Sequence, residues 1–188
     1  MTEWTRVKWT EAGQVVAQAS EDAPEEKEWS LAPSAYFTHL RAQKRRADAV
    51  KFLALALPRL EAVAWAARAV RDMKTGAEPK PEQVRALRSA LLWVSDPREP
   101  RRRAAHEAAQ ECNPASAECL VAMGAFCSGG SIAPENCPPV QPPRSAAGLF
   151  ASGAVLSAAA ASSNMQAALD AALDEGAKIA RDGLEAGQ

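Results

Sequence analysis

The fold class of this chain is decided by the stretch Arg59-Leu60-Glu61-Ala62-Val63-Ala64-Trp65-Ala66-Ala67-Arg68-Ala69-Val70-Arg71. Apolar side chains recur in it every three or four residues, at Leu60, Val63, Ala67 and Val70. This spacing places them on one face of an α-helix, with arginines around it. Alanine, the best helix former, supplies 43 of the 188 residues, while β-branched and aromatic residues are scarce. The sequence therefore predicts an all-α protein, with at most a short strand near the N-terminus.

Similar patterns elsewhere predict about seven helices, whose ends are marked by prolines, glycines and capping residues. They are expected at about 34–57, 59–75, 81–95, 100–112, 115–127, 145–162 and 164–183. A second apolar stripe runs through the third helix, at Val84, Leu87, Leu91 and Val94. Ser34 and Asn164 are the expected N-caps, and Pro81 suits a first turn. Because short connectors favour antiparallel neighbours, we expect stacked hairpins that pair the second helix with the third, the fourth with the fifth and the sixth with the seventh.

The chain divides into an irregular N-terminal segment, residues 1–33, and one helical domain, residues 34–188. Within the domain, the first helices occupy 34–127, a Gly/Pro-rich loop occupies 128–143, and a helical hairpin occupies 144–188. The N-terminal segment carries three tryptophans and an acidic run at 21–28. Because exposed tryptophans are costly, we expect this segment to pack on the body or to bind a partner. Its first part could form a short strand or lie across the globule.

Charge is unevenly distributed along the chain. Residues 34–112 carry a net charge of +7, whereas residues 1–33 and 113–188 each carry −4. The basic clusters are Arg41, Lys44, Arg45, Arg46 and Arg98, Arg101, Arg102, Arg103. The basic middle is either a solvated, internally paired face or a docking surface for an acidic protein. Nucleic acid is not expected as a partner, because no recognition motif accompanies these charges.

The arginine run Arg101–Arg103 opens a predicted helix, where positive charge opposes the helix dipole. Either an acidic neighbour compensates for this run or the arginines bind a partner. The uncharged stretch Ser145–Leu169 could in principle span a bilayer, but its alanine, serine and glycine content favours a buried helix pair. We therefore expect no membrane association. The charges and tryptophans of Met1–Thr10 argue against a secretory signal, so a cytoplasmic location is expected.

Chemical sites are not indicated by the cysteines or histidines. Cys112, Cys119, Cys127 and Cys137 form no closely spaced pair, so no metal site is expected. A Cys127–Cys137 disulfide would require an oxidising compartment, and reduced, buried cysteines are the expected state. His39 and His106 have no evident nucleophile partner. We predict no catalytic residue, no cofactor and no enzymatic activity.

The loop at 128–143 interrupts the helical pattern with Ser-Gly-Gly-Ser and five prolines among residues 134–143. Its glycines could end the preceding helix with a positive φ, and its prolines would stiffen the following chain. The loop is therefore either a structural crossover or a docking element for a partner. A phosphate-binding loop would need a following lysine and a helix N-terminus, and Ser131-Ile132-Ala133 offers neither.

Two segments of the chain resemble a signature of one bacterial family. They are Ala125-Phe126-Cys127-Ser128-Gly129-Gly130-Ser131-Ile132-Ala133-Pro134, continued by Pro138-Pro139-Val140-Gln141-Pro142-Pro143, and Leu57-Pro58-Arg59-Leu60-Glu61-Ala62-Val63-Ala64-Trp65. The family is an uncharacterised group of roughly 190-residue helical proteins, often encoded among type VI secretion genes beside effector and spike-tip components, so the resemblance covers most of the chain. Its members commonly have tryptophan where Cys127 stands here, which argues against a redox or metal role for Cys127. The resemblance carries over no catalytic residue.

This resemblance implies a non-enzymatic, protein-binding accessory of type VI secretion that assists effector folding or loading as a chaperone, co-chaperone or adaptor. Its partner would be a secretion effector, the effector's chaperone or a spike-tip protein. The alternative is an immunity protein that binds and neutralises a cognate toxin. The residues expected to bind a protein partner are Trp4, Trp9, Trp29, Arg101, Arg102, Arg103, Ser128, Gly129, Gly130, Ser131, Pro134, Pro138 and Pro139.

Overall fold

The protein is all-α, as predicted. The computed structural model describes residues 3–19, 27–73, 78–134 and 136–184. These residues contain nine α-helices, one 3-10 turn at Lys27–Ser30 and no β-strand. The helices are α1 (Ala12–Val16), α2 (Pro33–Ala42), α3 (Arg46–Ala56), α4 (Arg59–Asp72), α5 (Pro81–Ser95), α6 (Glu99–Gln110), α7 (Ala117–Phe126), α8 (Ala146–Ala161) and α9 (Met165–Asp182).

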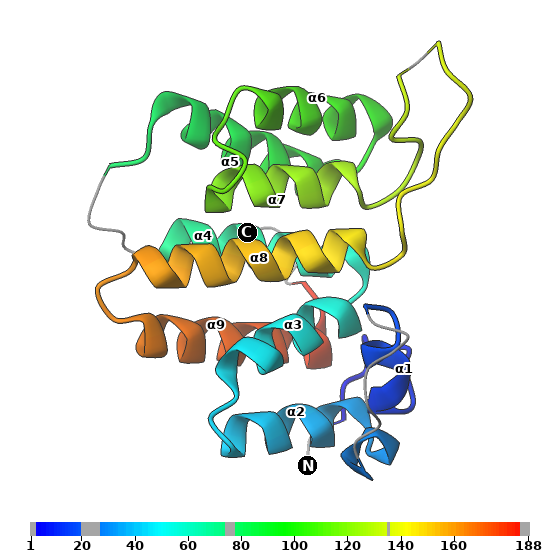
Figure 1. Ribbon diagram of the computed structural model, residues 1–188, viewed down its shortest axis with the longest axis vertical. Helices are drawn as coiled ribbons and strands as arrows, with labels where there is room; N and C mark the ends of the chain where they lie inside the picture. Colours follow the sequence, from blue (N-terminus) through cyan, green and yellow to red (C-terminus); the bar gives the residue numbers. More distant parts are fainter. Residues whose placement is uncertain (1–2, 20–26, 74–77, 135, 185–188) are drawn as a thin grey trace.

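Helix α8 lies in the middle of the molecule, where it contacts α3, α4, α7 and α9 (Figure 1). Small side chains permit this close packing: a Cβ atom on Gly148 would lie 2.8 Å from the carbonyl oxygen of Ala54 in α3. Burial on several sides explains why the α8 sequence has no charge. None of the helices in the described ranges is both long and apolar enough to cross a membrane.

The predicted antiparallel neighbours α4 and α5, α6 and α7, and α8 and α9 all contact one another. At one end of the molecule α5, α6 and α7 pack together, and α2 lies at the other end with α1 beside it (Figure 1). The stripe expected on α5 is turned partly outward, because α5 buries Ala86, Ala90 and Trp93 instead. Val84, which belongs to the predicted stripe, is 50% exposed.

The predicted single helix at 34–57 is wrong, because the chain turns between α2 and α3. Lys44 adopts a φ of 58°, in the left-handed region. The amide of Lys44 donates to the carbonyl of Arg41, and the amide of Arg45 donates to that of Leu40. These two bonds form a Schellman motif, which normally has glycine in the position that Lys44 occupies.

Of the two expected N-caps, Asn164 is confirmed and Ser34 is wrong. The side-chain oxygen of Asn164 accepts a hydrogen bond from the amide of Ala167, 3.1 Å away, at the start of α9. The N-cap of α2 is Ala32, two residues before Ser34, and Pro33 is the first residue of the helix. Proline suits that position because its missing amide hydrogen would have no partner there. Pro81 opens α5 in the same way, as predicted.

The described part of the N-terminal segment packs on the helical body, and it forms no strand. Trp4 is buried, with its ring centroid 5.1 Å from that of Phe37 in α2. The backbone amide of Arg6 donates to the carbonyl of Ala180 in α9, and its guanidinium pairs with Glu61 of α4 at 2.8 Å. Residues 21–26 of the acidic run lie outside the described residues.

Candidate functional site

The loop of residues 128–143, here called the anchored loop, begins where α7 ends. The Ser128 hydroxyl donates to the carbonyl of Ala125, 2.7 Å away, which closes the last turn of α7. Gly130 has a φ of 63°, so one of the two glycines has the predicted positive φ. A Cβ atom on Gly130 would also lie 3.0 Å from the guanidinium of Arg102. Glycine is therefore needed here both for backbone conformation and for close approach.

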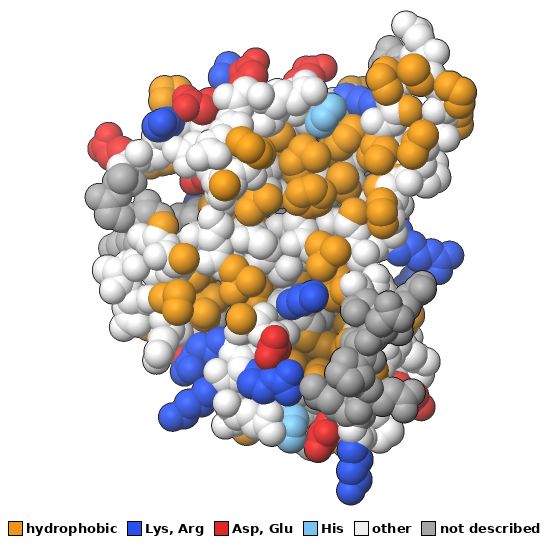
Figure 2. Space-filling view, viewed as in Figure 1, with side chains coloured by type: hydrophobic (Ala, Val, Ile, Leu, Met, Phe, Trp, Pro, Cys, Tyr) orange, Lys and Arg blue, Asp and Glu red, His pale blue; other side chains and the backbone are white. Residues whose placement is uncertain are grey.

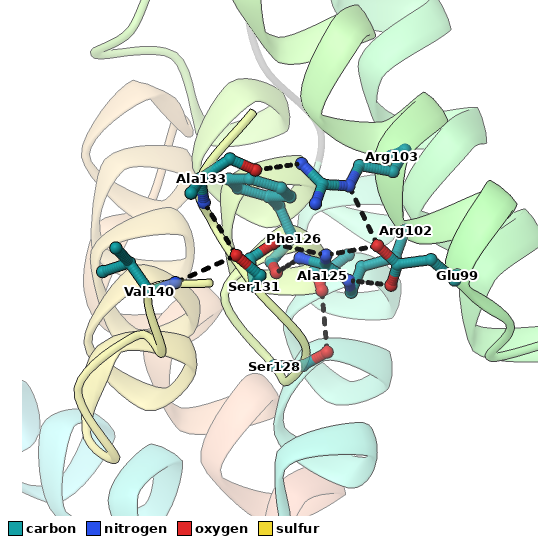
Figure 3. A network of polar contacts seen from close by, with 9 residues as sticks. All are labelled: Glu99, Arg102, Arg103, Ala125, Phe126, Ser128, Ser131, Ala133 and Val140. Carbon is teal, nitrogen blue, oxygen red and sulfur yellow. Dashed lines mark hydrogen bonds and ion pairs between the residues drawn. The ribbon is translucent and has the colours of Figure 1, made fainter. Parts of the chain in front are cut away.

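Arg102 of α6 holds the first limb of the anchored loop. Its side chain is 4% exposed, and its guanidinium donates to the carbonyl oxygens of Phe126 and Ser131 (Figure 3). Its neighbour Arg103 donates to the carbonyl of Ala133 at 3.0 Å. The two arginines thus bind three main-chain carbonyls, one at the end of α7 and two in the loop. Charge-assisted hydrogen bonds of this kind are stronger than neutral ones.

Glu99 balances the charge of these arginines. Its carboxylate accepts hydrogen bonds from Arg102 at 2.7 Å and from Arg103 at 2.9 Å. These bonds, chiefly those from Arg102, lower the pKa of Glu99 from its usual 4.5 to about 2. Glu99 is also the first residue of α6, where a negative charge suits the helix dipole. An acidic neighbour therefore compensates for the arginine run, which was one of the two expected arrangements.

The second limb of the anchored loop folds back onto the first through Ser131 (Figure 3). The Ser131 hydroxyl oxygen accepts hydrogen bonds from the amides of Ala133 at 3.1 Å and Val140 at 3.0 Å. The amide of Ile132 donates in turn to the carbonyl of Val140, 2.8 Å away. The backbone of Val140 is therefore held on both sides, while its side chain is 52% exposed.

Phe126 forms the floor beneath this network. It is buried, and the ring of His106 stacks on it with centroids 3.9 Å apart. The guanidinium carbons of Arg102 and Arg103 lie 4.8 and 5.7 Å from the Phe126 ring centroid, within cation–π range. Burial, followed by the charges of Arg103 and Arg102, lowers the pKa of His106. This histidine is therefore part of the packing that supports the loop.

The family model that matches the chain describes a family of unknown function, DUF6931, and covers residues 36–180. The chain belongs to the DUF6931 family. No curated protein and no solved structure matches it. The matched region of this DUF6931 protein contains all of the residues that anchor the loop, whereas Trp4, Trp9 and Trp29 precede it.

The predicted site residues of the DUF6931 protein fall into separate groups. Arg102, Arg103, Ser128, Gly130 and Ser131 come together at the anchored loop, and Gly129, Pro134, Pro138 and Pro139 lie along it. Arg101 is not part of this group. Its Nε atom lies 3.8 Å from Oδ2 of Asp96, and about half of its side chain is exposed. Trp4, Trp9 and Trp29 belong to the N-terminal segment and pack against the body.

Val140 is not among the predicted site residues, although it stands in the quoted loop motif between two proline pairs. Glu99 is also absent from the predicted site residues. Cys112, Cys119 and Cys127 are buried, and Cys137 is exposed. Burial raises the pKa of Cys127, and it raises that of Cys119 to about 11. Among the described residues there is no group of three His, Cys, Asp or Glu side chains arranged to hold a metal ion.

Proposed function

We propose that this DUF6931 protein is a non-enzymatic accessory that binds another protein through its anchored loop. The observation that carries the proposal is Val140, an apolar side chain that is half exposed although its backbone amide and carbonyl are both hydrogen-bonded. A loop held in one conformation loses little conformational entropy when a partner binds. Contiguous apolar surface on a rigid support is typical of docking sites.

The surroundings of Val140 support the same proposal. The exposed prolines Pro138 and Pro139 precede it, and they restrict the backbone further. Hydrophobic side chains gather over the upper part of one face of the molecule, from the anchored loop across to α7 (Figure 2). An apolar segment of a partner would bury this surface together with Val140. The inward-facing Arg102 acts in this proposal by positioning the loop.

The cellular setting rests on the resemblance of the Ser128–Pro134 motif to proteins encoded among type VI secretion genes. We place the protein in the cytoplasm, where it would assist the folding or loading of a secretion effector as a chaperone, co-chaperone or adaptor. The partner would be an effector, the effector's own chaperone or a spike-tip protein. The alternative role, as an immunity protein, makes a different prediction, because such a protein must neutralise the toxin that it binds.

The test compares two valine substitutions in a binding assay. The protein would be mixed with each effector, chaperone and spike-tip protein encoded beside its gene, and affinities measured by calorimetry. Val140→Asp should weaken binding by about tenfold or more, because it places a charge in an apolar contact. The matched control is Val84→Asp on α5, where the valine is 50% exposed, and it should leave affinity unchanged.

Two outcomes would overturn the proposal. One is the absence of binding to any of these proteins, and the other is an equal loss of affinity in both variants. If the bound partner is a toxin whose activity the protein abolishes, the immunity role replaces the accessory role.

A further inference from the structure

A hollow of about 520 Å³ lies at the base of the anchored loop, where α3, α4, α8 and the N-terminal segment meet. Its lining includes Lys8, Trp9, Gln18, Arg59, Arg144 and Gly148. Arg59 is the first residue of α4, and Arg144 immediately precedes Ser145, the N-cap of α8. Three segments that are distant in the sequence therefore each contribute one basic side chain to the same hollow.

The three basic side chains are exposed, and none forms an ion pair with a described residue. The described lining also contains no aspartate or glutamate. Elsewhere in the molecule arginines commonly have acidic partners; Arg46, for example, pairs with Asp170 at 2.8 Å. Like charges around one concave surface raise its positive potential, which favours an anion.

Two helix N-termini add to this potential, and the C-terminal end of α3, whose residues Ala54, Leu55 and Ala56 also line the hollow, offsets part of it. Helices α4 and α8 both start at the hollow, since Pro58 and Arg59 line it on one side and Arg144 and Gly148 on another. Neither helix has a side-chain hydrogen bond at its N-cap. The first amide groups of a helix have no partner within it, and together they carry a partial positive charge. Phosphate groups bind readily in such positions.

We propose that this hollow binds a phosphate-bearing small molecule. Arginine guanidinium groups match the geometry of phosphate oxygens, and the lysine adds a further positive charge. The half-buried Trp9 offers a flat apolar surface for the uncharged part of the ligand. The volume lies within the range typical of small-molecule sites.

The hollow is connected to the anchored loop through Arg59. Its guanidinium donates to the carbonyl of Ser128, the first loop residue, at 2.9 Å. A phosphate that contacts Arg59 therefore acts on a side chain that already holds the loop. The proposal does not depend on the protein-docking role of Val140.

The experiment is titration calorimetry of the full chain with inorganic pyrophosphate, ATP and adenosine. Pyrophosphate and ATP should bind, adenosine should bind more weakly than ATP, and the pyrophosphate affinity should fall as salt is added. The double variant Lys8→Gln, Arg144→Gln should lower the pyrophosphate affinity at least about tenfold. Neither side chain makes a hydrogen bond to a described residue, so the melting temperature should stay unchanged.

The matched control is Arg88→Gln on α5, an exposed arginine that does not line the hollow, and it should bind pyrophosphate like the wild type. The proposal is overturned if neither pyrophosphate nor ATP binds at about 1 mM, a concentration that reveals even weak complexes. It is equally overturned if the double variant binds pyrophosphate as the wild type does. A glutamate-rich peptide is titrated as well. If the peptide binds and pyrophosphate does not, the hollow binds an acidic protein segment and the proposed phosphate ligand is wrong.

Discussion

Lys44 ends helix α2 with a backbone conformation in the left-handed region, at a φ of 58°, although it is not a glycine. This conformation costs a non-glycine residue roughly 1–2 kcal/mol, and glycine avoids that cost. Glycine also loses more conformational entropy on folding, so only part of the gain remains. We expect Lys44→Gly to raise the free energy of unfolding by about 0.5–1 kcal/mol in urea denaturation. The control is Lys51→Gly inside α3, which should lower it by about 1 kcal/mol. A destabilised Lys44→Gly variant would contradict the Schellman geometry.

Glu99 makes the stability of the loop network depend on pH. Its pKa is lowered from 4.5 to about 2 in the folded protein, chiefly by hydrogen bonds from Arg102. A carboxylate whose folded pKa is lowered stabilises the protein fully above its usual pKa and loses this effect as the pH falls towards the folded value.

We therefore expect Glu99→Gln to lower the free energy of unfolding by about 1 kcal/mol at pH 7, a modest value because half of the Glu99 side chain is exposed. The difference from the wild type should shrink between pH 4.5 and pH 2. Urea denaturation of both proteins at a series of pH values measures this difference in the free energy of unfolding. A gap that stays constant across this range would show that the ion pair does not stabilise the fold.

At the scale of elements, α9 approaches α3 and α4 through Gly176. A Cβ atom at this position would lie 2.4 Å from Cδ2 of Leu53 and 2.8 Å from Nε1 of Trp65. The Trp65 indole cannot easily move away, because it is fully buried and donates to the carbonyl of Ala172 at 2.8 Å. Overpacking of such a contact typically costs 1–3 kcal/mol.

We predict that Gly176→Ala lowers the free energy of unfolding by about 1–2 kcal/mol, although alanine is the better helix former. Gly153→Ala in α8 provides the control, since its nearest neighbouring atom is Cδ1 of Leu120 at 3.6 Å. This variant should be stabilised by up to about 1 kcal/mol. Thermal melts of the pair test both values. If both substitutions stabilise the protein, α9 does not pack as closely as the structure indicates.

Most of the helices could be predicted from the sequence, because apolar spacing and punctuating prolines are local signals. The break between α2 and α3 could not, since Lys44 gives no glycine-like signal for a left-handed turn. The outward rotation of the apolar stripe on α5 could not be predicted from the sequence either, because alanines such as Ala86 and Ala90 can be buried as readily as leucines. Alanine-rich helices leave their buried face ambiguous.

Part of the candidate site could be predicted from the sequence. The Gly/Pro motif indicated a special loop, but its anchoring could not be predicted. Arg102 reaches carbonyl groups 24 and 29 residues further along the chain, and a main-chain carbonyl has no residue-specific signature. Only the fold brings these groups together.

At the scale of the whole molecule, the uneven charge distribution is partly internal pairing. Arg41 and Arg46 of the basic middle pair with Asp170 of the acidic C-terminal part, and Arg41 also pairs with Asp174. These ion pairs join α2 and α3, in the basic middle of the chain, to α9, in its acidic C-terminal part. Exposed pairs of this kind contribute only about 0–1 kcal/mol each, and the packed core remains the main source of stability.

The proposed docking role requires that hydrogen bonds hold the anchored loop in one conformation. Hydrogen exchange at the backbone amide of Val140 tests it most directly, because that amide donates to the Ser131 hydroxyl oxygen in an otherwise exposed part of the chain. We expect the Val140 amide to be protected in the wild type and in Ser157→Ala, a serine whose hydroxyl bonds elsewhere, to Ala115. Protection should be lost in Ser131→Ala. Exchange of the Val140 amide at the unprotected rate in the wild type would contradict the account.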